Sequence, residues 1–396
     1  MDKYLTTSIE KLKSGVYGDL NLVLGNESCD LDSAASALVY AAFLYWQHNQ
    51  IKCKVCTRMN RDESVYRDDI FVPILNVDRE DYDLKTEVAF CLRQHGIDAD
   101  RLVFRDDYDL EQLAEKSKTT VTLVDHHVLA KKDKFMTTMV TEIIDHRPVD
   151  KNEWTYKDDT RSSIELVGSC CSLVGQRIRT LGGLLAKETD FFNAFPVATD
   201  LLHCGIILDT VNFSKEVNKA TPVDEEVVLF LENLQKTRGS NCGVEEQRKA
   251  KLDLLVAARK DVSKLSAAQL LRKDVKIVGD TMVPSFPILV EEFLKKPEAI
   301  QAIQEALLRR ECNMALLLGM SLTDGLKRDG AVYSRNQERA AQLSKYLQEW
   351  KTPSLQLTLH EIPSAKNCIY FKQLNLSASR KQYMPALVNF LNASKK

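Results

Sequence analysis

The sequence predicts an α/β fold, with a doubly wound, mostly parallel sheet in an N-terminal domain and a smaller α/β domain after it. Two observations lead to this fold class. Between residues 20 and 145, short apolar runs alternate with stretches whose apolar residues recur at helical spacing. Acidic residues directly follow several of these runs, and parallel sheets bind ligands beyond the carboxyl ends of their strands.

The N-terminal elements are expected to follow one another as strand and helix. The run at 20–24 predicts a strand, and 33–47 predicts a helix because Ala34, Ala37 and Leu38 recur at helical spacing. The same reasoning predicts further strands at 70–75, 101–104, 120–124 and 140–144 and further helices at 84–94 and 109–116.

A chain of 396 residues is long enough for two domains, and a new pattern begins past residue 243. We therefore expect an N-terminal domain at 1–225, a charge-rich linker at 226–242 and a C-terminal domain at 243–396. The elements expected in the second domain are helices at 244–260, 287–310, 336–349 and 380–393 and strands at 275–283, 313–320, 354–360 and 367–374.

Composition excludes several function classes. A formal net charge of −2 argues against a binder of nucleic-acid duplexes, and no apolar run reaches the roughly 18 residues of a membrane span. The 10 cysteines are expected to be reduced and unliganded, because a chain of this length needs no disulfide scaffold. The first residues lack a signal or transit pattern, so cytoplasm is the default location, with a mitochondrial one left open.

Acidic and histidine side chains gather at four run ends. Asp30 and Asp32 follow the run at 21–24, Asp125-His126-His127 follows 121–124, Asp145-His146-Arg147 follows 142–144, and Asp209 follows 205–208. Carboxylates cost too much to collect in one apolar place unless a cation neutralises them. An oxygen-rich set with one imidazole suits two Mg²⁺ or Mn²⁺ ions, with Asp125 as the natural bridging carboxylate. The alternative for Asp30 or Asp32 alone is a helix N-cap.

Two further segments are candidates for phosphate binding. Gly168-Ser169 opens a predicted helix, where free N–H groups attract an anion, although a plain cap is an equal alternative. Lys276, Arg380 and Lys381 lie in the second domain and either face solvent or, if that domain closes over the metal site, hold phosphates.

These residues resemble the motifs of the DHH phosphoesterase superfamily. The four motifs correspond to 30–33, 123–127, 144–147 and 208–209, and Ser379-Arg380-Lys381 resembles the signature of the DHHA2 domain. That domain marks the branch with family II inorganic pyrophosphatases and exopolyphosphatases. The segments 25–33, 167–170 and 219–222 are similar to the prune subfamily.

The resemblance implies a two-domain hydrolase with its active site in the cleft between a DHH domain and a DHHA2 domain. Carried over by position, the ligands of two divalent cations would be Asp30, Asp32, Asp125, His146 and Asp209. Arg380, Lys381 and Lys276 would bind phosphate.

Two positions depart from the pyrophosphatase pattern. Asn26 replaces a histidine ligand and is expected to be a weaker, neutral oxygen donor that binds one metal less tightly and favours Mg²⁺. Arg147 replaces the second histidine of Asp-His-His, and arginine cannot act as a general acid at neutral pH. We expect Arg147 to clamp phosphate oxygens, with His126 or His127 as the candidate proton donor.

Three functions stay open. The first is release of phosphate from short polyphosphates by a two-metal hydroxide mechanism. The second is hydrolysis of cyclic AMP or cyclic GMP at the same metal site. The third is a regulatory scaffold with weak hydrolysis, which would have protein partners that the sequence does not identify. All three expect a small anionic phosphate ligand, without a nucleic-acid duplex or a membrane.

Overall fold

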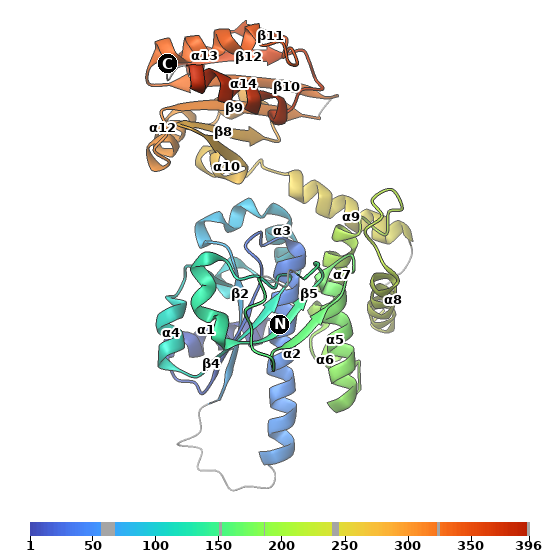
Figure 1. The fold of residues 1–396 in the computed structure, drawn as a ribbon. Helices are drawn as coiled ribbons and strands as arrows, with labels where there is room; N and C mark the ends of the chain where they lie inside the picture. Colours follow the sequence, from blue (N-terminus) through green and yellow to red (C-terminus); the bar gives the residue numbers. More distant parts are fainter. Residues whose placement is uncertain (57–67, 150–152, 186, 240–244, 323–324, 394–396) are drawn as a thin grey trace. The chain divides into compact units, whose positions relative to one another are not determined.

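The computed structural model describes residues 1–56, 68–149, 153–185, 187–239, 245–322 and 325–393 (Figure 1). The chain divides into two compact units, Met1–Arg259 and Lys260–Lys396. Each unit has its own six-stranded sheet. The α/β fold class is confirmed.

The first unit contains an all-parallel sheet in the order β3-β2-β1-β4-β5-β6. Its strands are β1 (Leu20–Leu24), β2 (Ile70–Leu75), β3 (Val103–Phe104), β4 (Thr119–Val124), β5 (Val140–Asp145) and β6 (Arg161–Ile164). The chain runs outward from β1 to β3 and then returns to β4 on the other side of β1. The carboxyl ends of β1 and β4 therefore form a topological switch point, where such sheets bind ligands.

Helices cover both faces of this sheet because its buried strands alternate their side chains between two cores. Val23 packs into the core shared with α2, α5 and α7, whereas Leu22 and Leu24 pack into the core shared with α1 and α4. The helices are α1 (Asp2–Ser14), α2 (Leu31–Cys56), α3 (Thr86–Gln94), α4 (Leu110–Lys116), α5 (Cys170–Leu185), α6 (Asp190–Ala194), α7 (Pro196–Asp209), α8 (Pro222–Thr237) and α9 (Glu245–Lys260). Three 3₁₀ helices span Arg79–Leu84, Ala99–Arg101 and Lys131–Met139.

The second unit has a mixed sheet in the order β11-β12-β10-β9-β8-β7, in which only the β8–β9 pair is parallel. Its strands are β7 (Val275–Val278), β8 (Thr281–Phe286), β9 (Met314–Ser321), β10 (Lys327–Ser334), β11 (Leu357–His360) and β12 (Cys368–Gln373). Its helices are α10 (Ala267–Lys273), α11 (Val290–Leu294), α12 (Ala299–Arg309), α13 (Gln337–Glu349) and α14 (Arg380–Ala393), with a 3₁₀ turn at Pro363–Ala365. Helices α13 and α14 share one core with the sheet.

Several element predictions need correction. Strand β10 was missed because it begins with Lys327, Arg328 and Asp329, yet Asp329 is buried and accepts hydrogen bonds from the N–H groups of Val290 and Glu291. The strand expected at 275–283 is the hairpin β7–β8, and the run at 205–208 belongs to helix α7. An apolar run that is buried on every side does not distinguish a strand from a helix.

The unit boundary lies later in the chain than expected. The described part of the predicted linker at 226–242 includes most of α8, which buries Val227, Val228 and Leu231 in the first core. Helix α9 also packs into this core through Leu255. Most charged residues of both helices lie on their outer faces, although Asp224 and Glu232 are buried. The exposed charges are why the composition of this segment resembles a linker.

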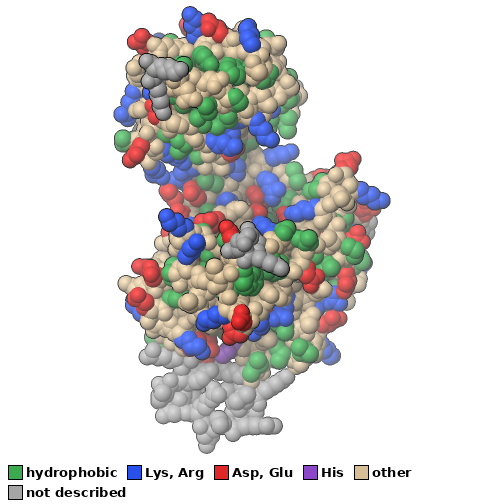
Figure 2. Space-filling view, in the orientation of Figure 1, with side chains coloured by type: hydrophobic (Ala, Val, Ile, Leu, Met, Phe, Trp, Pro, Cys, Tyr) green, Lys and Arg blue, Asp and Glu red, His purple; other side chains and the backbone are tan. Residues whose placement is uncertain are grey.

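Surface features agree with the composition. Lys and Arg side chains are mixed with Asp and Glu over the visible face of each unit (Figure 2). Among the described residues, no helix is both long and apolar enough to cross a membrane. The described thiols that are free are Cys29, Cys91, Cys170, Cys171, Cys204, Cys312 and Cys368.

Helices α7 and α5 pack so closely that adding one methyl group between them tests the contact. A Cβ atom at Gly205 would lie 2.5 Å from the buried Cys171 sulfur, so Gly205→Ala must displace the Cys171 side chain or separate the two helices. We expect this variant to lose about 1–3 kcal/mol of unfolding free energy in urea denaturation. Gly183→Ala is the matched control, because Gly183 lies on exposed α5 surface with nothing within 4 Å. Equal stability of the two variants would contradict this packing.

Candidate metal centre

The first acidic pair lies where β1 leads into α2. Asp30 caps the helix, since its Oδ1 accepts a hydrogen bond from the Ser33 N–H at 3.1 Å. Its other oxygen, Oδ2, accepts from the Ser28 hydroxyl at 3.2 Å. Asp30 is therefore an N-cap, as the alternative for a single Asp anticipated, and it remains partly exposed beside Asp32.

Asp32 is buried and joins α2 to the start of α5. Its carboxylate accepts hydrogen bonds from the Ser169 hydroxyl at 2.7 Å and from the N–H groups of Cys170 and Cys171 at 2.7 and 2.8 Å. These three donors occupy three of the roughly four lone-pair sites of a carboxylate. The remaining site lies on Oδ2, which is 3.8 Å from His146 Nε2.

Asp125 lies at the switch point, directly after β4. Its backbone has a φ of 62°, a left-handed conformation that Asp tolerates better than most residues. Its Oδ2 accepts a hydrogen bond from Asn26 Nδ2 at 2.5 Å, and its Oδ1 lies 3.2 Å from His146 Nε2 and 3.3 Å from Arg147 Nη2. This buried carboxylate therefore contacts groups from two other segments of the site, the loop at Asn26 and the motif with His146 and Arg147.

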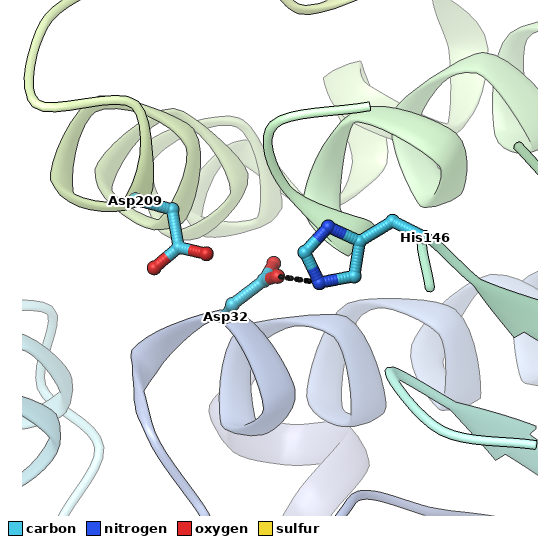
Figure 3. A group of neighbouring side chains, drawn as sticks. All are labelled: Asp32, His146 and Asp209. Carbon is cyan, nitrogen blue, oxygen red and sulfur yellow. Dashed lines mark ion pairs between the residues drawn. The ribbon is translucent and has the colours of Figure 1, made fainter. Parts of the chain in front are cut away.

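His146 presents one ring nitrogen to the carboxylates. Its Nδ1–H donates to the Val167 carbonyl at 3.0 Å, which leaves Nε2 facing Asp32 and Asp125. Figure 3 shows the ring of His146, directly after β5, and the carboxylates of Asp32 on α2 and Asp209 on α7 pointing toward one another. A backbone bond at the far nitrogen is the usual way to orient a metal-binding histidine.

Asp209 ends helix α7 at the other side of the cluster. Its Oδ2 accepts a hydrogen bond from Lys219 Nζ at 2.6 Å. Asp209 has a ligand atom within 4.8 Å of those of Asp32 and His146. Asp209 thus ends a helix rather than a strand, yet its carboxylate still lies at the predicted site.

Asp145 is a site residue that our predicted ligand set missed. It is fully buried at the end of β5, and its ligand atom lies within 4.8 Å of those of Asp125 and His146. Its Oδ2 also accepts from His127 Nδ1 at 2.5 Å. The parallel pairing of Val124 with Ile144 places Asp125 and Asp145 on neighbouring strands, a register that the motif alone does not reveal.

The charges of this cluster fit a bound cation. Burial and the neighbouring Asp32 raise the pKa of Asp125 to about 7, and burial and Asp32 raise the pKa of Asp209 to about 6. Burial lowers the pKa of His146, but its contacts with Asp125 and Asp32 outweigh this and raise it to about 9. Protons would thus neutralise a site that lacks a metal. Within the part of the chain that the structure describes, His146 belongs to both triads that could hold a metal ion, Asp32-His146-Asp209 and Asp125-Asp145-His146.

Asn26 turns its amide nitrogen, rather than its oxygen, toward the carboxylates. Its Oδ1 accepts from the Cys29 N–H at 3.1 Å and from the Ser28 hydroxyl at 2.7 Å, so the backbone donor fixes the orientation of the amide. The expected neutral oxygen donor is therefore committed to its own loop, and Asn26 orients Asp125 instead.

Both candidate proton donors are buried beside the cluster. His126 Nδ1–H donates to the Val124 carbonyl at 3.0 Å, and burial lowers the pKa of this histidine. His127 contacts the site through Asp145, and its carbonyl accepts from the Tyr156 hydroxyl at 2.7 Å. Of the two, His127 has the direct link to a candidate metal ligand.

The predicted anion turn at Gly168-Ser169 is filled by the chain itself. The Gly168 N–H donates to Asp224 at 2.8 Å, and the next donors go to Asp32. The anion at the start of α5 is thus a side chain of the protein, in place of the phosphate we expected.

The basic residues expected to hold phosphate lie in the second unit. Arg380 donates to the Asp274 carboxylate at 2.7 Å and to the Val283 carbonyl at 3.3 Å. Lys276 on β7 and Lys381 on α14 are exposed. Asp274 therefore already neutralises one of the three.

Comparison with known proteins places this chain in a family. It is 32% identical to exopolyphosphatase PRUNE1 of Mus musculus over 382 residues, which cover 94% of this chain and 76% of the relative. The human protein of the same name is 30% identical over 384 residues, with the same shares of both chains. The chain belongs to the prune family of exopolyphosphatases. The prune family is thereby confirmed, and with it the DHH superfamily that the motifs resemble.

Two further similarities concern a domain family and a solved structure. The DHHA2 domain family model matches residues 253–390, which begin in α9 and end in α14. A Methanococcus jannaschii protein assigned to the family II inorganic pyrophosphatases overlaps with 94% of this chain and 99% of its own at 19% identity, with a TM-score of 0.45. The family assignment rests on the mouse and human prune sequences.

Proposed function

We propose that this member of the prune family is a metal-dependent phosphohydrolase that releases phosphate from short-chain polyphosphates. Its mouse and human relatives are named exopolyphosphatases, which are enzymes that hydrolyse phosphoanhydride bonds. The observation that carries the proposal is the pair of carboxylate–histidine triads that share His146 at the switch point of the sheet. Hard carboxylate oxygens with one imidazole favour Mg²⁺ or Mn²⁺.

The proposed ligands of two divalent cations are Asp30, Asp32, Asp125, His146 and Asp209, with Asp145 as an addition from the structure. When bound, such cations activate a water molecule and neutralise phosphoryl oxygens. The protein holds the ligands still: Ser169 and the start of α5 fix Asp32, and Asn26 fixes Asp125. This preorganisation lets the site stabilise developing charge without rearrangement.

Arg147 supports a preference for polyphosphate over pyrophosphate. Its guanidinium is half-exposed and donates to the Asp125 carbonyl at 2.6 Å, so it lies at the rim of the cluster with donors left over. It can clamp a phosphate but cannot protonate a leaving group. We propose that His127, held by Asp145, transfers the proton to the leaving group instead.

A substrate panel tests the function. Phosphate and nucleotide release are measured with Mg²⁺ and with Mn²⁺ from pyrophosphate, tri- and tetrapolyphosphate, long polyphosphate, cyclic AMP and cyclic GMP. Turnover confined to the short polyphosphates would support the proposal. Turnover of the cyclic nucleotides would favour the phosphodiesterase alternative. No turnover of any of these substrates would favour a regulatory scaffold.

Metal binding has its own expected result, independent of turnover. A cation that binds only the folded state at about 100 times its Kd adds about 2.7 kcal/mol of stability. We therefore expect Mn²⁺ or Mg²⁺ to raise the melting temperature of the chelator-treated protein by several degrees. Asp209→Asn should reduce this rise, whereas Asp253→Asn on exposed α9 should leave it unchanged. Equal rises in both variants would contradict the metal centre.

A further inference from the structure

We propose that Lys219 is a substrate-binding residue of this centre, which contacts phosphate at the rim of the metal cluster and favours multiply charged polyphosphates. The inference rests on the proposed function and assigns one more residue to it. Lys219 lies outside the four acidic motifs, in the segment between α7 and α8.

The position of Lys219 is fixed by contacts on both sides. Its Nζ donates to Asp209 Oδ2 at 2.6 Å. Two residues later, Thr221 caps α8 together with Asp224, whose buried carboxylate also accepts from Gly168 and Ser172. The lysine is thus tied to the turn that supports Asp32.

The chain bends sharply to bring this lysine back to Asp209. Val211, Asn212 and Phe213 all have left-handed backbone, with φ values of 50°, 50° and 60°. Such conformations cost non-glycine residues about 1 kcal/mol or more each, most of all a β-branched valine. An ordinary surface ion pair contributes about 0–1 kcal/mol and would not offset this strain. We infer that the loop geometry serves the placement of Lys219.

Lys219 has donors left for a ligand. An ammonium group offers three N–H donors, and the Lys219 side chain keeps 39% of its surface exposed while one donor holds Asp209. Arg147, on the other side of the cluster, is 45% exposed and holds Asp125 in the same manner. Each cation binds a candidate metal ligand on one side and faces solvent on the other.

The net charge of the metal-loaded centre explains how Arg147 and Lys219 would help to bind an anionic substrate. The carboxylates of Asp30, Asp32, Asp125, Asp145 and Asp209 carry five negative charges, and two divalent cations carry four positive ones. One negative charge remains, which would repel an anionic substrate. Arg147 and Lys219 together reverse the sign. A polyphosphate gains more from this reversal than a cyclic nucleotide, which has a single negative charge.

The test compares Lys219→Met, Lys219→Arg and a control, Lys249→Met, which removes a lysine of the same unit from its ion pair with Asp253 at 2.7 Å. Hydrolysis of tripolyphosphate gives KM and kcat, and calorimetry gives the affinity of inorganic phosphate for the Mn²⁺-loaded protein. The rise in melting temperature with Mn²⁺ reports metal binding.

We expect Lys219→Met to raise KM and to weaken phosphate binding about tenfold, the effect of losing one charge-assisted hydrogen bond. Lys219→Arg should recover most of this loss, and Lys249→Met should match the wild type. The melting response to Mn²⁺ should stay intact in all three. Unchanged phosphate affinity in Lys219→Met would overturn the proposal, and so would a lost Mn²⁺ response, because Lys219 would then only support Asp209.

The calorimetric comparison separates this proposal from the proposed function. A wild-type protein that binds phosphate with Mn²⁺ but hydrolyses nothing would reject the activity, while the Lys219 comparison is still decided by affinity. A wild-type protein that binds no phosphate would reject both.

Discussion

Asp125→Asn is expected to abolish phosphate release while the protein stays folded. Asp125 is the carboxylate that contacts the most site groups, with Asn26, His146 and Arg147 all within 3.3 Å. A neutral amide neither bridges two cations nor neutralises them. Bound metal ions lower the activation free energy by several kcal/mol, so we expect their loss to reduce kcat by at least about 10³-fold.

Asparagine is the right replacement because of the backbone. Asp125 has a φ of 62°, which Asn tolerates and Ala does not, so Asp125→Ala would add strain to the loss of charge. The melting temperature of Asp125→Asn without metal should lie within about 5 °C of the wild type. Its rise with Mn²⁺ should be largely lost. Wild-type turnover in a folded Asp125→Asn protein would remove this centre from the reaction.

The fold followed from the sequence where local pattern and tertiary environment agree. Buried parallel strands read as apolar runs, so β1, β2, β4 and β5 were predicted within one residue of their ends. The first-domain strand to which the sequence pattern assigned no bounds, β6, lies at the sheet edge, and its Arg161 and Ser162 are exposed. Pattern analysis depends on burial, and an edge strand has little.

The candidate site followed from one rule, that the ends of parallel strands meet. This rule placed Asp32, Asp125 and His146 together correctly, since each follows a strand near the switch point. It could not show from which donor groups each carboxylate would accept its hydrogen bonds. Asp32 bonds to Cys170 across 138 residues of sequence, and Asn26 to Asp125 across 99. The first bond depends on the packing of α5 against α2, which no local pattern encodes, and the second on the pairing of β1 with β4.

Asp32→Ala is expected to damage stability as well as activity, because this residue is both a candidate ligand and the cap of α5. Its removal leaves the Ser169 hydroxyl and the N–H groups of Cys170 and Cys171 buried without their acceptor. A lost cap costs about 1 kcal/mol, and a buried donor without a partner costs about 1–3 kcal/mol. Relief of repulsion with Asp125 offsets part of this, so we expect a loss of about 3 kcal/mol in urea unfolding without metal.

Asp109→Ala is the matched control for this cap. Asp109 caps α4 at an exposed position, where its Oδ1 accepts from the Gln112 N–H at 3.1 Å and water can replace it. We expect this variant to lose about 1 kcal/mol or less and to keep full activity. Asp32→Asn should fall between the two in stability, since one amide oxygen can still accept from part of the set, and should remain inactive. If Asp32→Ala were as stable as Asp109→Ala, the buried donors of α5 would have found other acceptors. The carboxylate of Asp32 would then belong to the metal centre alone.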